Sequence, residues 1–136
     1  MDALLETVAR LFEGVDEVWH VGDWQEPGVL DGLRKIAPLT AVNGNAPDDP
    51  SYPERIKRQV EGLAIGMVHR PPRQDDPWLR GLDICIHGHT HRWRDDTLNG
   101  VRLINVSTPT LAPKDSRTVA VLTVEGREAR LEKLLV

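Results

Sequence analysis

The chain contains a single cysteine among its 136 residues, so an internal disulfide bond is excluded. Cys85 lies in an apolar run, and we expect a small buried residue in a protein of the reducing cytoplasm. No apolar run approaches the about 18–20 residues that a membrane span needs. The amphipathic amino terminus lacks the basic lead and the cleavage site of a secretory signal. We therefore predict a cytoplasmic protein without a membrane partner.

The sequence also lacks an excess of positive charge. Its formal net charge is -4 and its isoelectric point is about 5.7. These values argue against general binding to nucleic acids or to anionic membranes. Internal repeats and low-complexity tracts are absent too. Hydrophobic residues make up 40% and charged residues 28%, which is typical of a globular protein. We predict one domain over residues 1–136.

The first third of the sequence alternates helical and strand patterns. Apolar residues recur at helical spacing over residues 4–12, and a short apolar run at 17–21 predicts a strand. Pro27 can begin a second helix, which must end before Pro38, and residues 39–42 predict the next strand. Helix, strand, helix, strand is the order of an α/β unit with parallel strands.

The later sequence predicts one more strand, at residues 83–86, and three hairpins. The hairpin strands are 55–60 with 63–69, 93–98 with 101–105, and 118–124 with 128–135. Asn99-Gly100 is a strong hairpin-turn signal. Parallel units followed by antiparallel hairpins predict an α/β fold in which two mixed β-sheets pack face to face, flanked by α-helices. This architecture is a four-layer sandwich.

Polar residues follow directly on four of the predicted strands. They are Asp23, Asn45, His69 and His89. Taken singly, Asp23 could cap a helix, Asn45 could be a turn residue and His69 a hydrogen-bonded strand end. Together they would converge where strand ends meet, and a carboxylate, an amide oxygen and two imidazoles suit manganese, iron or zinc. His91 could reach the same ion or a second one.

Four motifs carry a resemblance. Val-Gly-Asp at 21–23, Asn-Gly-Asn at 43–45, Val-His at 68–69 and Gly-His-Thr-His at 88–91 resemble, in order, the motifs of the calcineurin-like metallophosphoesterases. The similarity is to the small bacterial and archaeal phosphodiesterases, which are related to the phosphoesterase-like subunit of retromer. It extends from about Val15 to the last hairpin. The resemblance implies a two-sheet sandwich with two metal ions at its strand ends.

The resemblance also implies roles for single residues. Asp23 would bridge two divalent transition metal ions, Asn45, His69 and His89 would complete one site, and His91 would belong to the other. A metal-activated hydroxide would attack the phosphorus of a small phosphodiester or phosphomonoester, with Asp23, Asn45 and His89 as the catalytic set. His87 has no ligand role in the family pattern, and we expect it beside the ligands or in solvent.

The chain departs from the family pattern. The Asp-x-His strand that serves the His91 site is missing, Ala46-Pro47 replaces the residue that protonates the leaving group, and Arg70 replaces a glycine. Asp48 and Asp49 are the candidate substitutes for this proton donor. The chain is therefore either a shortened enzyme or a degenerate relative that serves as a binding or scaffold module. We expect a weak or absent second ion, and a homo-oligomer that covers the edges left by the missing strand.

Aromatic and basic residues flank the motifs. Trp24 and Trp93 follow candidate ligands, and we favour packing or subunit contact over stacking on a substrate. Arg92 and Arg94, like Arg70, lie next to motif residues and could clamp a phosphate.

Overall fold

The computed structural model describes residues 3–24, 27–45, 47–90, 92–106 and 117–136. The helices are α1 (Ala3–Leu11), α2 (Pro27–Arg34) and the short 3-10 helix η1 (Pro77–Leu79). The strands are β1 (Val18–His20), β2 (Leu39–Ala41), β3 (Arg55–Val60), β4 (Leu63–Val68), β5 (Ile84–His87), β6 (Trp93–Leu98), β7 (Val101–Val106), β8 (Thr118–Glu125) and β9 (Glu128–Leu135).

The first third forms the α/β unit that the sequence predicts. After α1, Gly14 has a φ of 86°, the left-handed conformation that commonly follows a helix. Pro27 begins α2, since the first helical turn does not use the N–H group that proline lacks. β1 and β2 follow the two helices and pair in parallel, with Val18 opposite Leu39.

The largest sheet has five strands in the order β3-β4-β5-β7-β6. Its inner strands β4, β5 and β7 are parallel, and hairpins add β3 and β6 antiparallel at the two edges. The β6–β7 turn is Asn99-Gly100 with φ of 53° and 82°, as expected for this dipeptide. β8 and β9 form a separate antiparallel hairpin.

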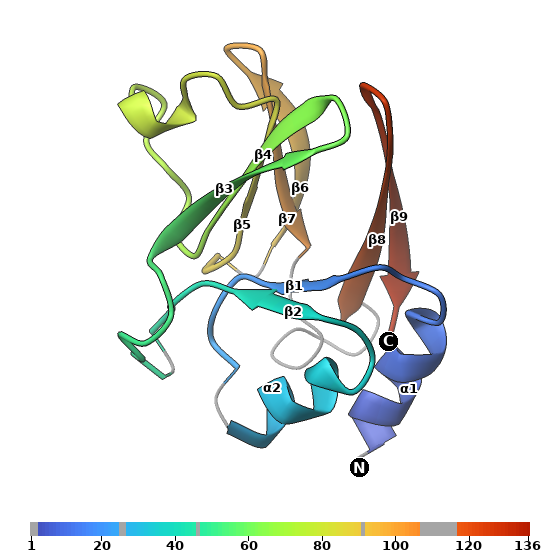
Figure 1. Cartoon of the computed structure of the whole chain (residues 1–136). Helices are drawn as coiled ribbons and strands as arrows, with labels where there is room; N and C mark the ends of the chain where they lie inside the picture. The colour runs from blue at the N-terminus through green and yellow to red at the C-terminus, as the bar shows by residue number, and fades with distance from the viewer. Residues whose placement is uncertain (1–2, 25–26, 46, 91, 107–116) are drawn as a thin grey trace.

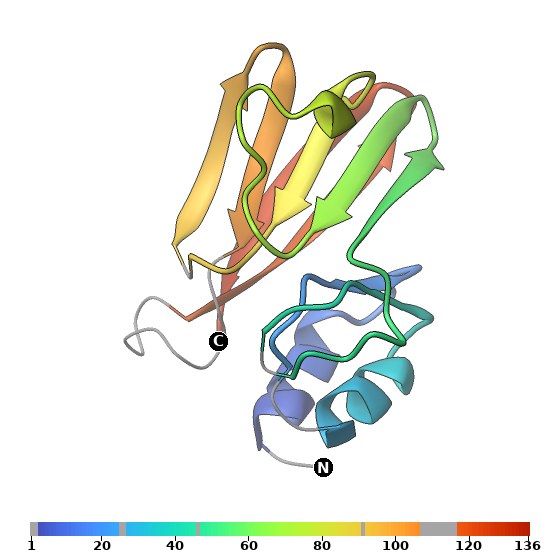
Figure 2. The ribbon, with the colours of Figure 1, turned by 90° about the vertical axis from the view of Figure 1, so that its left-hand side faces the viewer.

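The two faces of the five-stranded sheet pack on different elements (Figures 1 and 2). Ile84 and Ile104 belong to a cluster that Trp19 of β1 and Leu122 of β8 also contact. β8–β9 therefore forms a second layer on one face, and β1–β2 adjoins that layer at the end of the sheet to which β4, β5 and β7 point. Cys85, next along β5, points to the opposite face because side chains alternate in a strand. That face is covered by the η1 segment, through residues such as Trp78.

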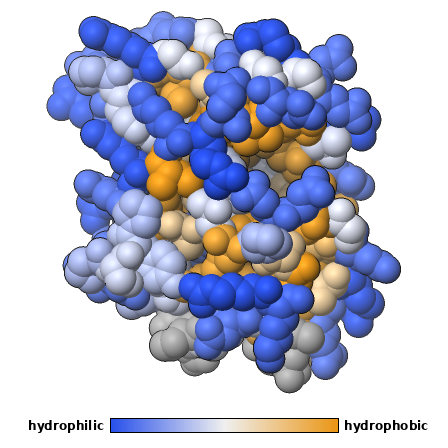
Figure 3. Space-filling view, in the orientation of Figure 1, coloured by the Kyte–Doolittle hydropathy of each residue, from blue (hydrophilic) through white to orange (hydrophobic). Residues whose placement is uncertain are grey.

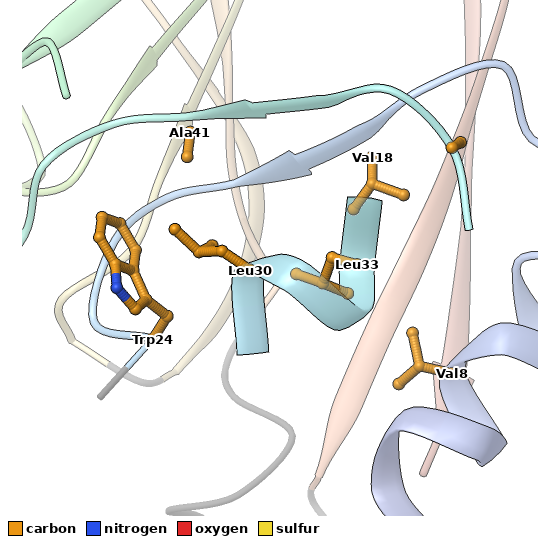
Figure 4. Close-up of a cluster of buried hydrophobic side chains, with 7 residues drawn as sticks. Val8, Val18, Trp24, Leu30, Leu33 and Ala41 are labelled. Carbon is orange, nitrogen blue, oxygen red and sulfur yellow. The ribbon is translucent and has the colours of Figure 1, made fainter. Parts of the chain in front are cut away.

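A separate cluster fills the space between β1–β2 and the two α-helices (Figure 4). Its labelled members are Val8, Val18, Trp24, Leu30, Leu33 and Ala41. This packing places α1 and α2 outside the second layer and fixes the loops that leave β1 and β2. The same loops carry two of the predicted site motifs.

The mixed α/β fold with a large central sheet is confirmed. Two details differ from the sequence expectation: within the described residues the second sheet consists of two unconnected pairs, β1–β2 and β8–β9, and no α-helix covers the outer face of the five-stranded sheet. Figure 3 shows apolar side chains at the surface between that sheet and the β8–β9 hairpin. None of the described helices is long and apolar enough to cross a membrane.

Candidate metal centre

Two of the candidate ligands have unusual backbone conformations. Asp23 has a φ of 61° and His89 a φ of 69°, and Gly22 before Asp23 has a φ of 99°. Positive φ is uncommon for residues other than glycine and tends to occur at functional sites. Asp23 comes three residues after β1 and His89 two residues after β5, and the sharp turns direct both side chains to the strand ends.

The glycines of the first two motifs allow two loops to touch. A Cβ atom on Gly44 would lie 2.7 Å from both the backbone nitrogen and Oδ1 of Asp23. A Cβ atom on Gly22 would lie 2.9 Å from the Cα of Gly44 and 2.9 Å from Nδ1 of His69. These distances are shorter than real Cβ contacts, so both positions require glycine for steric reasons.

Asp23, His69 and His89 lie together at these strand ends. Their potential ligand atoms are all within 4.8 Å of one another. Nε2 of His69 is 3.3 Å from Oδ2 of Asp23 and 3.3 Å from Nδ1 of His89. His69 is 5% exposed, so this convergence lies at the edge of the protein interior.

The hydrogen bond at Nδ1 of His69 explains why the cluster suits a cation. Nδ1 of His69 donates to the carbonyl oxygen of Val21 at 2.7 Å, because a carbonyl can only accept. Neutral His69 therefore presents the lone pair of Nε2 to the carboxylate of Asp23, which is itself an acceptor. Two acceptors in contact repel unless a proton or a metal ion lies between them. An imidazole fixed by a carbonyl on its other nitrogen is typical of metal ligands.

Asn45 also lies beside Asp23, through its backbone. Its N–H group donates to Oδ1 of Asp23 at 2.6 Å, which leaves Oδ2 toward His69. The side chain of Asn45 is exposed and makes no hydrogen bond to other described residues. The ligand role predicted for its amide therefore stays a prediction. His91, the fifth predicted ligand, lies outside the described residues.

His20 supports the turn that carries Asp23. Its Nδ1 accepts from the N–H group of Gly22 at 3.1 Å, and its ring contacts Trp24 edge-on at 5.9 Å. Burial lowers the pKa of His20 to about 4, against an opposing effect of the charge on Asp23. His20 is therefore neutral at neutral pH.

Asn105 and His87 hold the loop that carries His89. Nδ2 of Asn105 donates to the carbonyl oxygen of Gly88 at 3.3 Å and to Oγ1 of Thr90 at 2.7 Å. Nδ1 of His87 donates to the same carbonyl at 3.1 Å. His87 is 2% exposed, so of the two expected environments the solvent one is wrong, and burial lowers its pKa. Sequence reasoning did not assign this supporting role to Asn105.

Other expected participants have structural roles. Oδ1 of Asp48 accepts from Nδ2 of Asn43, and Asp49 accepts from the backbone and hydroxyl of Ser51, which lowers the pKa of Asp49. Neither carboxyl is placed as a proton donor. Trp24 is 5% exposed and packs edge-on against Tyr52, so the packing interpretation is confirmed for it.

A family model described as a calcineurin-like phosphoesterase superfamily domain matches residues 1–127. The chain belongs to this superfamily. A probable metallophosphoesterase of Methanothermobacter thermautotrophicus is 31% identical over 139 residues, which covers 93% of this chain and 80% of the relative. The family implies a hydrolase that depends on metal, and Asp23, His69 and His89 of this phosphoesterase domain form a possible metal site.

Solved structures show the same fold. Wild-type Vps29 of Entamoeba histolytica, in complex with Zn²⁺, matches with a TM-score of 0.75 at 19% identity, covering 95% of this chain and 87% of Vps29. A protein described as a novel archaeal phosphodiesterase matches with a TM-score of 0.73 at 22% identity, covering 96% of this chain and 92% of that protein. At these identities the similarity concerns the fold alone.

Proposed function

We propose that the chain is a metal-dependent phosphoesterase that hydrolyses a small phosphodiester or phosphomonoester. Asp23, His69 and His89 hold one divalent ion, manganese, iron or zinc, with Asn45 as a further ligand. The observation that carries this proposal is the convergence of a carboxylate oxygen and two imidazoles at the strand ends of a phosphoesterase domain. His91 stays the predicted ligand of a weak or absent second ion, and a cytoplasmic location stays a prediction.

The residues of the chain prepare this site. A divalent ion supplies a lowered pKa for water and neutralises charge on the phosphate oxygens. The N–H of Asn45 takes one lone pair of Oδ1 of Asp23, and the carbonyl of Val21 orients His69 with Nε2 unprotonated. Both contacts exist before substrate arrives, so little reorganisation is needed when charge develops.

The site offers no well-suited acid, among the described residues, to protonate the leaving group. Asp48 and Asp49 are both held by hydrogen bonds in their own loop, and the low pKa of Asp49 makes its carboxyl a poor acid. Aryl esters release an anion that needs no proton, whereas alkyl esters do. We therefore expect much faster hydrolysis of aryl esters than of alkyl esters.

The proposal is tested by hydrolysis of bis(4-nitrophenyl) phosphate and 4-nitrophenyl phosphate with added manganese or zinc. Turnover that chelator abolishes is the expected result for the wild-type chain. Asp23→Ala and His89→Ala should each lower the rate at least about 100-fold. Asp31→Ala is the matched control, since this carboxylate is exposed on α2 and, among the described residues, pairs with Arg34 alone. Equal rates in Asp23→Ala and Asp31→Ala would contradict the assigned site.

The alternative function is a binding or scaffold module that keeps the fold without turnover. The similarity in fold to Vps29 favours it. The two functions separate when metal binding and hydrolysis are measured on the same sample. Stoichiometric metal with no hydrolysis of either ester would favour the module.

A further inference from the structure

A pocket of about 560 Å³ opens beside the candidate metal centre. We call it the arginine pocket. It is lined by Pro71, His87, Thr90, Arg92, Trp93, Arg94 and Asp96. Thr90 directly follows His89, and Pro71 comes two residues after His69. The segments that hold two candidate ligands therefore continue straight into the pocket wall.

One arginine of the pocket is held rigidly. Nε of Arg94 donates to both carboxylate oxygens of Asp96, at 3.1 and 2.9 Å. Nη1 of Arg94 lies 3.3 Å from Nε2 of His87. Because Nδ1 of His87 donates to a carbonyl, its Nε2 accepts from the guanidinium. A buried histidine and a carboxylate thus fix Arg94 from two sides. Such fixation lowers the entropy lost when the guanidinium binds a ligand.

The other charges make the pocket attractive to an anion. Arg92 is exposed and forms no ion pair with any residue the structure describes. Asp96 is the only carboxylate among the lining residues that the structure describes, so two guanidinium groups accompany one negative charge. Guanidinium groups bind phosphate oxygens bidentately.

We propose that the arginine pocket binds a second phosphate group of the substrate, while the ester at the metal centre is cleaved. Arg92 and Arg94 are the residues that bind it. This inference rests on the proposed function and narrows its substrate class to phosphate esters that carry a further phosphate monoester. The chain as a whole carries a net charge of -4. Two arginines beside one carboxylate are therefore a local exception that favours an anionic ligand at this pocket.

The test compares two substrates that differ by one phosphate. Thymidine 5′-(4-nitrophenyl phosphate) and its 3′-phosphorylated form release the same nitrophenolate. For the wild-type chain we expect kcat/KM to be about tenfold higher for the 3′-phosphorylated substrate, through KM. In Arg92→Gln and Arg94→Gln that ratio should approach one. Arg10→Ala, an exposed arginine of α1, should keep it. No preference in the wild-type chain, or an unchanged ratio in both glutamine variants, would overturn the proposal.

A binding measurement separates this inference from the proposed function. If neither ester is hydrolysed, calorimetry with thymidine 3′,5′-bisphosphate and thymidine 5′-monophosphate still examines the pocket. If the bisphosphate binds more tightly than the monophosphate, and Arg92→Gln removes this difference, the pocket binds phosphate even though the chain is not an enzyme. Equal binding of the two nucleotides would refute the pocket whether or not the chain is an enzyme.

Discussion

At the scale of single residues, the candidate centre depends on glycines that have no Cβ atom as well as on its ligands. Gly44 has no Cβ where one would lie 2.7 Å from Oδ1 of Asp23. Gly44→Ala should therefore shift the Asp23 turn and weaken zinc binding about 10- to 100-fold. Gly28→Ala is the matched control, because nothing lies within 4 Å of its added Cβ. It should leave zinc affinity unchanged and stabilise α2 by about 0.5–1 kcal/mol. Calorimetry with zinc measures both variants.

A second residue-scale prediction concerns pH. The pKa of His20 is about 4 in the folded chain, below the usual value of 6.5. As the pH falls, the His20 imidazole is protonated in the unfolded chain before it is protonated in the folded chain. The contribution of neutral His20 to the free energy of unfolding is therefore complete above pH about 6.5 and is lost as the pH falls toward 4. The loss can reach about 3 kcal/mol. Urea unfolding of chelator-treated protein at several pH values measures it.

His20→Asn provides the comparison for that experiment. Asparagine can still accept from the N–H group of Gly22, but it does not titrate. The variant should lose less stability between pH 6.5 and 4 than the wild-type chain, with the fall due to His87 remaining. Identical pH profiles for the two proteins would show that His20 is not the titrating group.

At the scale of elements, the β3–β4 turn contacts the β8–β9 turn and connects the two layers. The N–H of Gly62, in the β3–β4 turn, donates to the carbonyl oxygen of Gly126, in the β8–β9 turn, at 2.6 Å. Arg127 donates to the carbonyl of Gly62 at 2.7 Å and to Asp83 at 3.2 Å. Arg127→Ala should lower the free energy of unfolding by about 1 kcal/mol. Arg130→Ala, on the exposed side of β9, should change it by less than about 0.5 kcal/mol. Equal effects would argue against this contact.

The same elements show what the sequence could predict. Local signals located the hairpins, since Asn99-Gly100 readily adopts the positive φ that a tight hairpin turn requires and alternation marks the flanking strands. Strand ends followed by Asp23, His69 and His89 located the candidate site, because chain order places such residues at one edge. The division of the second sheet had no signal, since pairing between distant strands is not encoded in local periodicity. The exposed side chain of Asn45 was likewise not predictable from its motif.

At the scale of the whole molecule, the open strand edges favour association. Within the described residues β1 pairs only with β2 and β8 only with β9, and apolar side chains reach the surface near β8–β9 (Figure 3). Unpaired edges and apolar surface are both common at subunit contacts. We therefore predict a homodimer or a higher homo-oligomer at micromolar concentration. Light scattering after size exclusion measures the mass. A monodisperse monomer of 15.2 kDa would contradict this prediction.

The central claim is that Asp23, His69 and His89 hold a divalent ion, and metal titration tests it most directly. Chelator-treated protein is titrated with zinc or manganese and the bound ion is measured by calorimetry and elemental analysis. We predict about one equivalent per chain, lost in His69→Ala and retained in Asp31→Ala. Binding should also weaken below pH about 6, because imidazoles ligate only when unprotonated. Less than about a tenth of an equivalent with either metal, or full binding in His69→Ala, would contradict the account.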